Sequence, residues 1–433
     1  MSFQQKEKSK IAILTIKNSY GYGGVLTCVQ QVYKFCQKYF DPTVFVLSFD
    51  KDISASLKSF KFFSGTKKSE YFGMKCIEIG ARWAFWEPGH YVYTLPAWKE
   101  LLHDYKYFFF KSGSCIAAYP LVQLNKKFVA WVGTSYEDDK AQRVEKLSGF
   151  RYLIDRVSAS KMRRIEREIL QKADVLFSIS RNTRKRIEQI LGYNRDNLFI
   201  CGYPLESLRD VAPLLLRANR KGETKQNKNI IAVGRFSDPR KNIEMLLRVF
   251  DKLFSKDSEL KLFVIGKVPS PKILSKYQNL SSFKNIAFTG PLSAQKMEKY
   301  YKSSSLMLLT SYQEGLGIVG LEALSYGIPV VTTDCGGTKD YVIDGQNGYL
   351  VKINDDDDMA AKALKILSSP QLHQKMSNFA VEFIEQNFSQ NKIYSIFKFG
   401  LIKVYPELKD LFEQSKSDDK LDLSKSYDRV LQA

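Results

Sequence analysis

The sequence predicts an α/β protein built from two domains, each with a parallel sheet. At 433 residues the chain is too long to fold around a single hydrophobic core of ordinary size. Strand-like and helix-like segments alternate from Ile11 and again from Ile230, as in parallel α/β sheets. Between the two series, Arg217 to Asn229 is polar with almost no apolar side chains, which predicts a domain boundary. We therefore expect two similar α/β domains that face one another.

The first series opens as a strand–helix–strand unit. Ile11 to Ile16 is short, apolar and β-branched, which is typical of a buried parallel strand. A glycine-rich loop to Gly24, a helix over Val25 to Tyr39 and a strand over Val44 to Phe49 follow. For residues 51–100 the sequence predicts only loops and short elements. The later expected elements are strands at 107–110, 128–132 and 175–179 and helices at 151–172 and 183–191, the last ended by Gly192.

The second series is more regular. Its expected strands lie at 230–233, 260–265, 286–288, 306–309, 330–333 and 348–353, and its helices at 243–254, 294–302 and 359–367. Four acids, Asp355 to Asp358, stand just before the last helix. Acids at that position cap a helix and complement its dipole, which we prefer to a metal site.

Composition narrows the class of protein. The net charge of +20 lies mainly in the first half and favours a membrane surface or acidic polysaccharide over nucleic acid as partner. None of the six cysteines forms a Cys-x-x-Cys pair, which favours buried free thiols in a reducing compartment. Met1 to Lys10 is polar, unlike a signal peptide, and no apolar run reaches the length of a membrane span. We expect a cytoplasmic protein that can contact the inner face of a membrane peripherally.

The most informative segment is Glu314 to Glu322, in which two carboxylates bracket a glycine-broken apolar stretch between a strand and a helix. Gly315 and Gly317 let the backbone approach a ligand, and the helix that follows directs unpaired N–H groups at the same loop. This pattern predicts a phosphate-binding helix start.

A basic pair can complete that site. Arg235 follows the strand at 230–233, and Lys241 precedes the next helix, so both belong to the carboxyl edge of the sheet, where Glu314 also lies. Arg235 would grip phosphate oxygens as a fork and Lys241 would act as a point charge. Glu322, inside the helix, can accept from vicinal ribose hydroxyls, and Glu314 can reach a sugar hydroxyl or the phosphates.

These residues resemble the retaining glycosyltransferases of the GT-B fold, family 4 (glycosyl transferases group 1). Gly234 to Asn242 resembles the family's basic diphosphate-binding segment. Ser311 to Gly337 resembles its two-glutamate signature, and Asp344 to Val351 resembles the turn and strand that close the domain. The resemblance implies two Rossmann-like domains facing across a cleft. Residues 1–216 would be the acceptor domain, 217–390 the nucleotide-sugar donor domain, and 391–433 a helix crossing back to the first domain plus a polar tail.

The resemblance also implies a function: transfer of a sugar from a UDP- or GDP-sugar to a glycan or lipid-linked acceptor in polysaccharide biosynthesis. Arg235 and Lys241 would hold the diphosphate, Glu322 the ribose and Glu314 the donor sugar, with Glu314, Arg235 and Lys241 as the catalytic set. Gly23 and Gly24, in a stretch resembling the family's glycine loop, would form the opposite wall. The remaining donor-binding positions are Gly315, Leu316, Gly317, Ile318 and Val319.

The first half departs from the family in one respect. Members often carry a histidine just after a middle strand of this domain, but the matching stretch, Ala130 to Asp139, has none. The chain's histidines are His90, His103 and His373, and we expect His103 at the surface. The candidates for meeting the sugar are Thr134, Ser135, Glu137 and Asp138.

The mechanism implied is front-face transfer, in which the leaving diphosphate helps to deprotonate the acceptor and no protein nucleophile is required. Fixed cations and helix amides can stabilise the diphosphate, so we expect no cofactor and no metal. The tryptophan-bearing segment at 81–98 suggests an acceptor with sugar rings, on which aromatic side chains stack.

Three alternatives stay open. A nicotinamide-dependent oxidoreductase would explain Gly21-Tyr22-Gly23-Gly24, but its fingerprint needs glycine where Leu26 stands. A sugar-nucleotide epimerase or a phosphorylase would share the phosphate chemistry. A non-catalytic module that binds a membrane or another anionic surface would use the basic helix at 151–172, whose pattern also fits an ordinary amphipathic helix with a solvated basic face.

Overall fold

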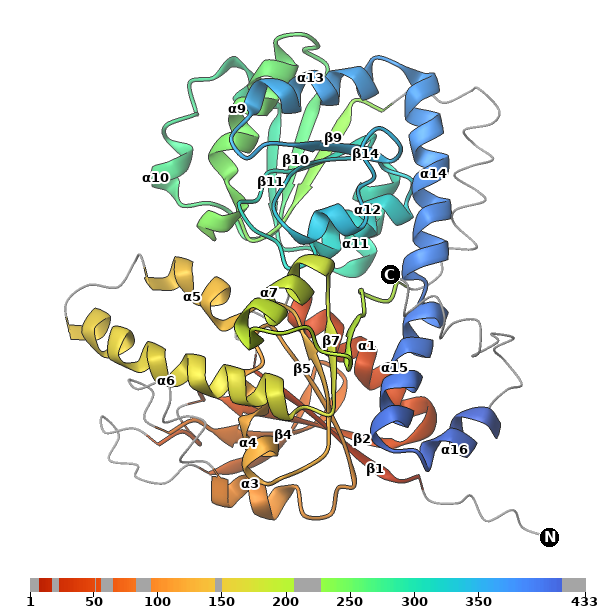
Figure 1. The fold of residues 1–433 in the computed structure, drawn as a ribbon. Coiled ribbons are helices and arrows are strands. Elements are labelled where there is room, and N and C mark those ends of the chain that lie inside the picture. The colour runs from red at the N-terminus through yellow and green to blue at the C-terminus, as the bar shows by residue number, and fades with distance from the viewer. Residues whose placement is uncertain are drawn as a thin grey trace. The chain divides into compact units, whose positions relative to one another are not determined.

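The computed structural model describes residues 8–17, 23–50, 52–55, 65–82, 95–144, 150–205 and 227–414. The chain forms two compact units, the first from residues 1–203 and 393–433 and the second from Pro204–Lys392 (Figure 1). Each contains a largely parallel sheet with helices, so the α/β prediction is confirmed. Most of the predicted polar boundary, 217–226, lies outside the described residues.

The first unit contains an eight-stranded sheet in the order β3-β4-β2-β1-β5-β6-β7-β8. The strands are β1 (Lys10–Ile16), β2 (Asp41–Ser48), β3 (Thr66–Tyr71), β4 (Met74–Gly80), β5 (Tyr107–Ser112), β6 (Val129–Val132), β7 (Val175–Ser178) and β8 (Leu198–Ile200). All neighbours pair in parallel except β3 and β4, which form an antiparallel hairpin. Phe72 and Gly73 turn this hairpin with positive φ angles of 51° and 80°.

Helices cover both faces of this sheet. They are α1 (Gly24–Tyr39), α3 (Leu95–Leu101), α4 (Tyr119–Gln123), α5 (Tyr136–Val144), α6 (Phe150–Lys172), α7 (Arg181–Leu191), α15 (Gln390–Val404) and α16 (Leu408–Gln414). Ile165 and Ile169 of α6 are buried in the core, so this helix is amphipathic, as its sequence pattern indicates. Gly192 ends α7 with a left-handed backbone, φ 82°, as predicted.

The helix α15 packs on the first unit's sheet through Phe397. Its ring lies 5.4 Å from that of Phe109 and 5.2 Å from that of Trp131, centroid to centroid. Gly400, one turn further along, allows this close approach, because a Cβ there would lie 2.3 Å from the Phe177 ring. The late segment of the chain is therefore part of the first unit's core.

The second unit contains a six-stranded parallel sheet in the order β11-β10-β9-β12-β13-β14. The strands are β9 (Asn229–Val233), β10 (Lys261–Ile265), β11 (Ile286–Gly290), β12 (Leu306–Leu309), β13 (Val330–Thr333) and β14 (Gly348–Val351). The order reverses between β9 and β12, which are neighbours in the sheet. The carboxyl ends of two such strands form a crevice in which parallel α/β proteins bind ligands.

The helices of this unit are α9 (Ile243–Phe254), α10 (Pro271–Leu274), α11 (Ala294–Lys302), α12 (Ile318–Ser325), α13 (Asp356–Leu367) and α14 (Pro370–Phe388). Helix α9 packs against α13, and α12 against α14 (Figure 1). Asp355 caps α13 by accepting from the N–H of Asp358 at 3.0 Å, and Asp356 binds Arg248 of α9. The capping interpretation of the four acids is confirmed.

The six cysteines are free and buried, as predicted. Across the described part of the chain, none of the helices combines the length and hydrophobicity that a membrane crossing requires.

Candidate active site

The candidate site lies where β9 and β12 end. The loop after β9 carries Arg235 and the short 3-10 helix η3 (Pro239–Lys241), and the loop after β12 carries Glu314. The two loops touch through their backbones, because the N–H of Tyr312 donates to the carbonyl of Arg240 at 2.8 Å. The residues predicted from two distant motifs therefore share one edge at the topological switch point.

Lys241 and Glu314 form an ion pair across these loops. Nζ of Lys241 lies 2.5 Å from Oε1 of Glu314, and Oγ of Ser311 donates to the same oxygen at 2.6 Å. The two charged side chains are only 17% and 12% exposed. This pair links the proposed diphosphate-binding lysine directly to the proposed sugar-binding glutamate, a contact that the sequence did not predict.

Two glycines shape the first loop. A Cβ on Gly234 would lie 3.3 Å from Cε of Lys241, so the lysine stem crosses this glycine. Gly266, just after β10, has φ 116°, and a Cβ there would lie 2.1 Å from the carbonyl oxygen of Gly234. Sequence reasoning missed Gly266, although a glycine directly after a predicted strand is a signal for close backbone approach.

Arg235 lies beside Asp238, with Nη2 3.6 Å from Oδ2. Asp238 also caps η3 and binds Arg240. Burial pushes the pKa of Asp238 up, but the hydrogen bonds and charges of Arg240, with the charge of Arg235, hold the pKa below its ordinary value. The carboxylate therefore stays ionised and orients both arginines.

The backbone of the second loop is fixed by the segment after β13. The N–H of Glu314 donates to the carbonyl of Cys335 at 2.7 Å, and the N–H of Gly337 donates to the carbonyl of Glu314 at 3.0 Å. A Cβ on Gly337 would lie 2.1 Å from the carbonyl oxygen of Gly315. Glycine is therefore required at position 337 for a steric reason, because the backbone there lies against the backbone of Gly315.

Tyr341 holds the start of α12 in place. Its hydroxyl donates to the carbonyl of Gly317 at 2.9 Å, and its side chain is fully buried. Gly317 has φ 81°, and a Cβ on Gly320 would lie 2.3 Å from the Tyr341 hydroxyl. The α12 start that the sequence assigned to phosphate is thus held in place by a tyrosine that the sequence did not single out.

The predicted positions at this helix start differ in exposure. Leu316 is buried, 3% exposed, whereas Gly315, Ile318 and Val319 are partly exposed. The contribution of Leu316 to a ligand would therefore come through its backbone.

Glu322 lies in α12 and is held by Tyr301 of α11. The Tyr301 hydroxyl donates to Oε2 of Glu322 at 2.8 Å, and its ring stacks on that of Tyr326 at 5.1 Å. Burial raises the pKa of Glu322, while the Tyr301 hydrogen bond opposes this rise. Glu322 keeps a second carboxylate oxygen that a sugar hydroxyl could bind. Tyr301 was not singled out, since nothing in its local sequence marks it.

The first unit holds the predicted glycine loop and the acceptor-side candidates. Gly23, with φ 129°, precedes α1, which Gly24 begins, whereas Tyr20 to Tyr22 lie outside the described residues. The N–H groups of Gly133 and Thr134 both donate to the carbonyl of Gly113. Thr134 therefore lies at the carboxyl edge of this sheet.

The other acceptor-side candidates have structural partners. Oγ of Ser135 accepts from the N–H of Asp138 at 3.1 Å, as a helix cap. Glu137 forms ion pairs with Arg163 and Arg186, both at about 3 Å. Trp98 is 2% exposed, so this member of the 81–98 segment cannot stack on a sugar, and Trp83 and Trp86 lie outside the described residues.

The two histidines in the described part of the chain, His103 and His373, have structural partners. His103 is exposed, as predicted, and its Nδ1 lies 3.0 Å from Asp104. Nε2 of His373 lies 2.8 Å from the carbonyl of Ser305; burial lowers its pKa and this hydrogen bond opposes the change. His90 falls outside the described residues. Within the described ranges, no cluster of three or more His, Cys, Asp or Glu side chains is arranged to hold a metal ion.

Part of the chain matches the model of a known protein family. Residues 217–383 match the family model of the glycosyl transferases group 1. The matched part contains Arg235, Lys241, Glu314 and Glu322. It also contains both tyrosines that support them, so the whole candidate site lies in the segment that matches the glycosyl transferases group 1.

The curated proteins that are similar to this chain include the following two. N-acetyl-alpha-D-glucosaminyl L-malate synthase of Bacillus anthracis is 25% identical over 227 residues, which cover 52% of this chain and 58% of the relative. The capsular polysaccharide biosynthesis glycosyltransferase CapM of Staphylococcus aureus is 27% identical over 160 residues, 36% of this chain and 40% of the relative. The chain thus spans about half the length of the curated relatives it matches.

Solved structures share the fold of most of this chain. HepE from Anabaena in complex with UDP has a TM-score of 0.67 at 15% identity, over 90% of this chain and 99% of HepE. Sucrose-phosphate synthase from Thermosynechococcus elongatus has a TM-score of 0.66 at 17% identity, over 94% and 100%. The predicted GT-B fold, with two Rossmann-like α/β domains, is confirmed.

Proposed function

We propose that this protein is a glycosyltransferase that uses a nucleotide-diphosphate sugar, with a UDP-sugar as the first choice. The observation that carries the proposal is the Lys241–Glu314 ion pair at the switch point, between the loop that also carries Arg235 and the loop that leads into α12. Within the segment that matches the family, this pair places a positive charge for the diphosphate next to a carboxylate for the donor sugar. UDP is favoured because HepE was solved with UDP and with UDP-glucose.

The donor would lie along the carboxyl edge of β9 and β12. Lys241 has three N–H donors, so it can keep its bond to Glu314 and bind a phosphate oxygen at the same time. Arg235 and the backbone amides from Leu316 to Val319 would take the remaining phosphate oxygens. Glu322 would accept from the ribose, and Glu314 would orient the donor sugar.

Transfer would proceed on the front face with retention. The bond between the sugar C1 and the diphosphate oxygen breaks, the acceptor oxygen bonds to C1 on the same face, and the acceptor proton passes to the departing phosphate oxygen. No protein nucleophile takes part. Arg235, Lys241 and the start of α12 stabilise the charge that develops on the diphosphate, so that no metal is needed, and positioning supplies the rest.

The acceptor would be a glycan or a lipid-linked glycan bound by the first unit. The excess of positive charge in the first half of the chain supports an anionic acceptor or peripheral contact with an anionic membrane. Thr134, at the carboxyl edge of the first sheet, is our candidate for contact with the sugar.

Thermal-shift measurements with UDP, GDP and ADP test the donor. A ligand that binds only the native state raises the melting temperature, and we expect UDP to do so most strongly. Transfer from the matching nucleotide sugar, assayed with and without EDTA, tests the reaction, and the anomeric configuration of the product tests retention. Absence of any shift by nucleoside diphosphates would overturn the proposed donor site, and activity abolished by EDTA would overturn the metal-free mechanism.

A further inference from the structure

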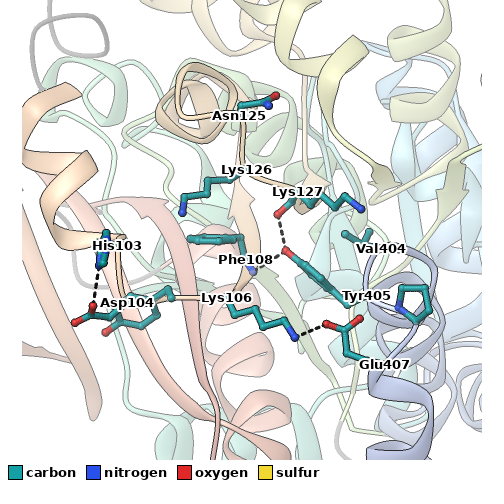
Figure 2. Close-up of a pocket in the computed structure, with 12 residues that line it drawn as sticks. His103, Asp104, Lys106, Phe108, Asn125, Lys126, Lys127, Val404, Tyr405 and Glu407 are labelled. Carbon is teal, nitrogen blue, oxygen red and sulfur yellow. Dashed lines mark hydrogen bonds and ion pairs between the residues drawn. The ribbon is translucent and has the colours of Figure 1, made fainter.

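A pocket of about 600 Å³ in the first unit is lined by the residues that Figure 2 draws. It lies at the opposite end of the unit's sheet from Thr134. It is a wide depression that is open to solvent rather than an enclosed cavity. It opens near the start of β5, whereas Thr134 follows the end of β6, the neighbouring parallel strand. The six residues of β5 extend about 20 Å between these edges. The pocket is therefore separate from the edge assigned to the acceptor.

Three segments that are far apart in the sequence build this pocket: residues 103–108, 125–127 and 404–407. Tyr405 ties them together, because its hydroxyl accepts from the N–H of Phe108 at 3.1 Å and donates to the carbonyl of Lys127 at 2.5 Å. Tyr405 is 5% exposed, and burial raises its pKa, so the hydroxyl stays protonated as a donor. Figure 2 shows both bonds at the wall of the pocket.

Lysines give the pocket its charge. Lys106, Lys126 and Lys127 come from two of the segments, and Nζ of Lys126 lies 5.3 Å from the centre of the Phe108 ring. The two carboxylates at the rim already have partners: Asp104 lies 3.0 Å from His103, and Glu407 lies 2.8 Å from Lys106. The charge of Glu407 also interacts with that of Lys127, so Lys106 and Lys127 share this carboxylate. The pocket therefore presents net positive charge.

We propose that this pocket binds the phosphate group of a phosphorylated ligand. Ammonium groups are compact point charges with several N–H donors, which suit a tetrahedral oxyanion. Figure 2 shows the Lys126 and Lys127 side chains pointing away from each other, so a single phosphate contacts only one of them. Lys126 binds the phosphate oxygens, and Lys106, which keeps Glu407, and Lys127 add their charge. The phosphate can belong to a soluble phosphate ester or to a phospholipid headgroup, and the two sources are distinguishable by experiment.

The test compares two double variants, each of which removes two positive charges from a different part of the first unit. Lys126→Ala/Lys127→Ala removes the pocket's lysines, and Lys67→Ala/Lys68→Ala removes two exposed lysines from the edge strand β3 of the same unit. Both pairs are made in a chain that also carries Arg235→Ala and Lys241→Ala, so that phosphate binding at the candidate donor site is suppressed. The soluble probe is glycerol 1-phosphate in isothermal titration calorimetry. The lipid probe is co-sedimentation with phosphatidylcholine vesicles, with and without phosphatidylglycerol.

We expect the Lys126/Lys127 variant to bind its probe about fivefold more weakly, as loss of one exposed ion pair and of a second nearby charge predicts, with the Lys67/Lys68 variant unchanged. Loss with glycerol 1-phosphate identifies a soluble ester, and loss with phosphatidylglycerol vesicles alone identifies a headgroup. Equal binding by both variants, or no binding of either probe to the parent chain, would overturn the proposal. Melting temperatures of both variants check that the unit stays folded.

Discussion

Nζ of Lys241 lies 2.5 Å from Oε1 of Glu314, although the two residues follow different strands of the second sheet and stand 73 positions apart. The sheet brings them together because its strand order reverses between β9 and β12. A largely buried pair of this kind fixes both side chains, and each loses its partner when the other is removed. The pair thus couples the proposed phosphate-binding group to the proposed sugar-binding group.

Lys241→Ala should reduce kcat/KM severely. It removes a charge-assisted hydrogen bond to the diphosphate, which typically contributes about 1.5–3 kcal/mol, or roughly 10- to 150-fold in rate. Steady-state kinetics with the nucleotide sugar measure this loss. Lys272→Ala, which removes an exposed lysine of α10 in the same unit, is the matched control. Near-normal activity of Lys241→Ala would exclude the site assignment.

Glu322→Gln should separate recognition of the ribose from recognition of the phosphates. Replacing a charge-assisted hydrogen bond by a neutral one costs about 1 kcal/mol, so UDP should bind about fivefold more weakly. Pyrophosphate, which has no ribose, should bind as before, whereas Lys241→Ala should weaken both ligands. Calorimetric titration with UDP and with pyrophosphate measures the difference. An equal loss for the two ligands would contradict the ribose role.

Tyr341→Phe should weaken the site without unfolding the protein. The substitution removes only the hydroxyl that holds the carbonyl of Gly317 at the start of α12. A neutral hydrogen bond contributes about 0.5–1.5 kcal/mol, which predicts a loss in kcat/KM of roughly 2- to 12-fold. Tyr349→Phe, at another buried tyrosine of the second unit, is the control. If both variants behave alike, the hydroxyl of Tyr341 does not position the loop.

The regular elements of the second unit follow closely from the sequence, and those of the first unit less so. The helix at 243–254 and the strands at 306–309 and 330–333 were predicted to the residue, because polar or glycine-containing turns bound strongly patterned segments. By contrast, β3 and β4 were missed. The edge strand β3 is mostly exposed and reads Thr-Lys-Lys-Ser-Glu-Tyr, so a single buried side chain, Tyr71 at its end, is too weak a pattern to predict a strand.

The candidate site, too, was only partly predictable from the sequence. That Arg235, Lys241 and Glu314 share one edge follows from the alternation of strands and helices, since parallel strands end at the same edge. The contacts that hold these residues in place could not be predicted from the order of strands and helices. Tyr301 and Tyr341 reach Glu322 and Gly317 across 21 and 24 positions of the chain, and tertiary packing alone determines such contacts.

Glu166→Gln should stabilise the protein at alkaline pH. Glu166 of α6 is 2% exposed and accepts from the N–H of Tyr136 at 2.7 Å, a bond that the glutamine oxygen can keep. Burial raises the pKa of Glu166 to about 7, with Glu137 and Asp138 raising it further and the Tyr136 bond and Arg186 opposing them. The folded protein therefore holds this proton more tightly than the unfolded chain does.

Because the folded pKa lies above the unfolded one, ionisation of Glu166 costs stability as the pH rises. The cost grows from pH 4.5, the ordinary glutamate value, to about 7, and is complete above it. We expect Glu166→Gln to gain about 1–3 kcal/mol at pH 8 and progressively less toward pH 5. Thermal melts across this range measure the gain, with Glu168→Gln on the same helix as control. A gain that does not change with pH, or a loss at pH 8, would contradict a buried ionised Glu166.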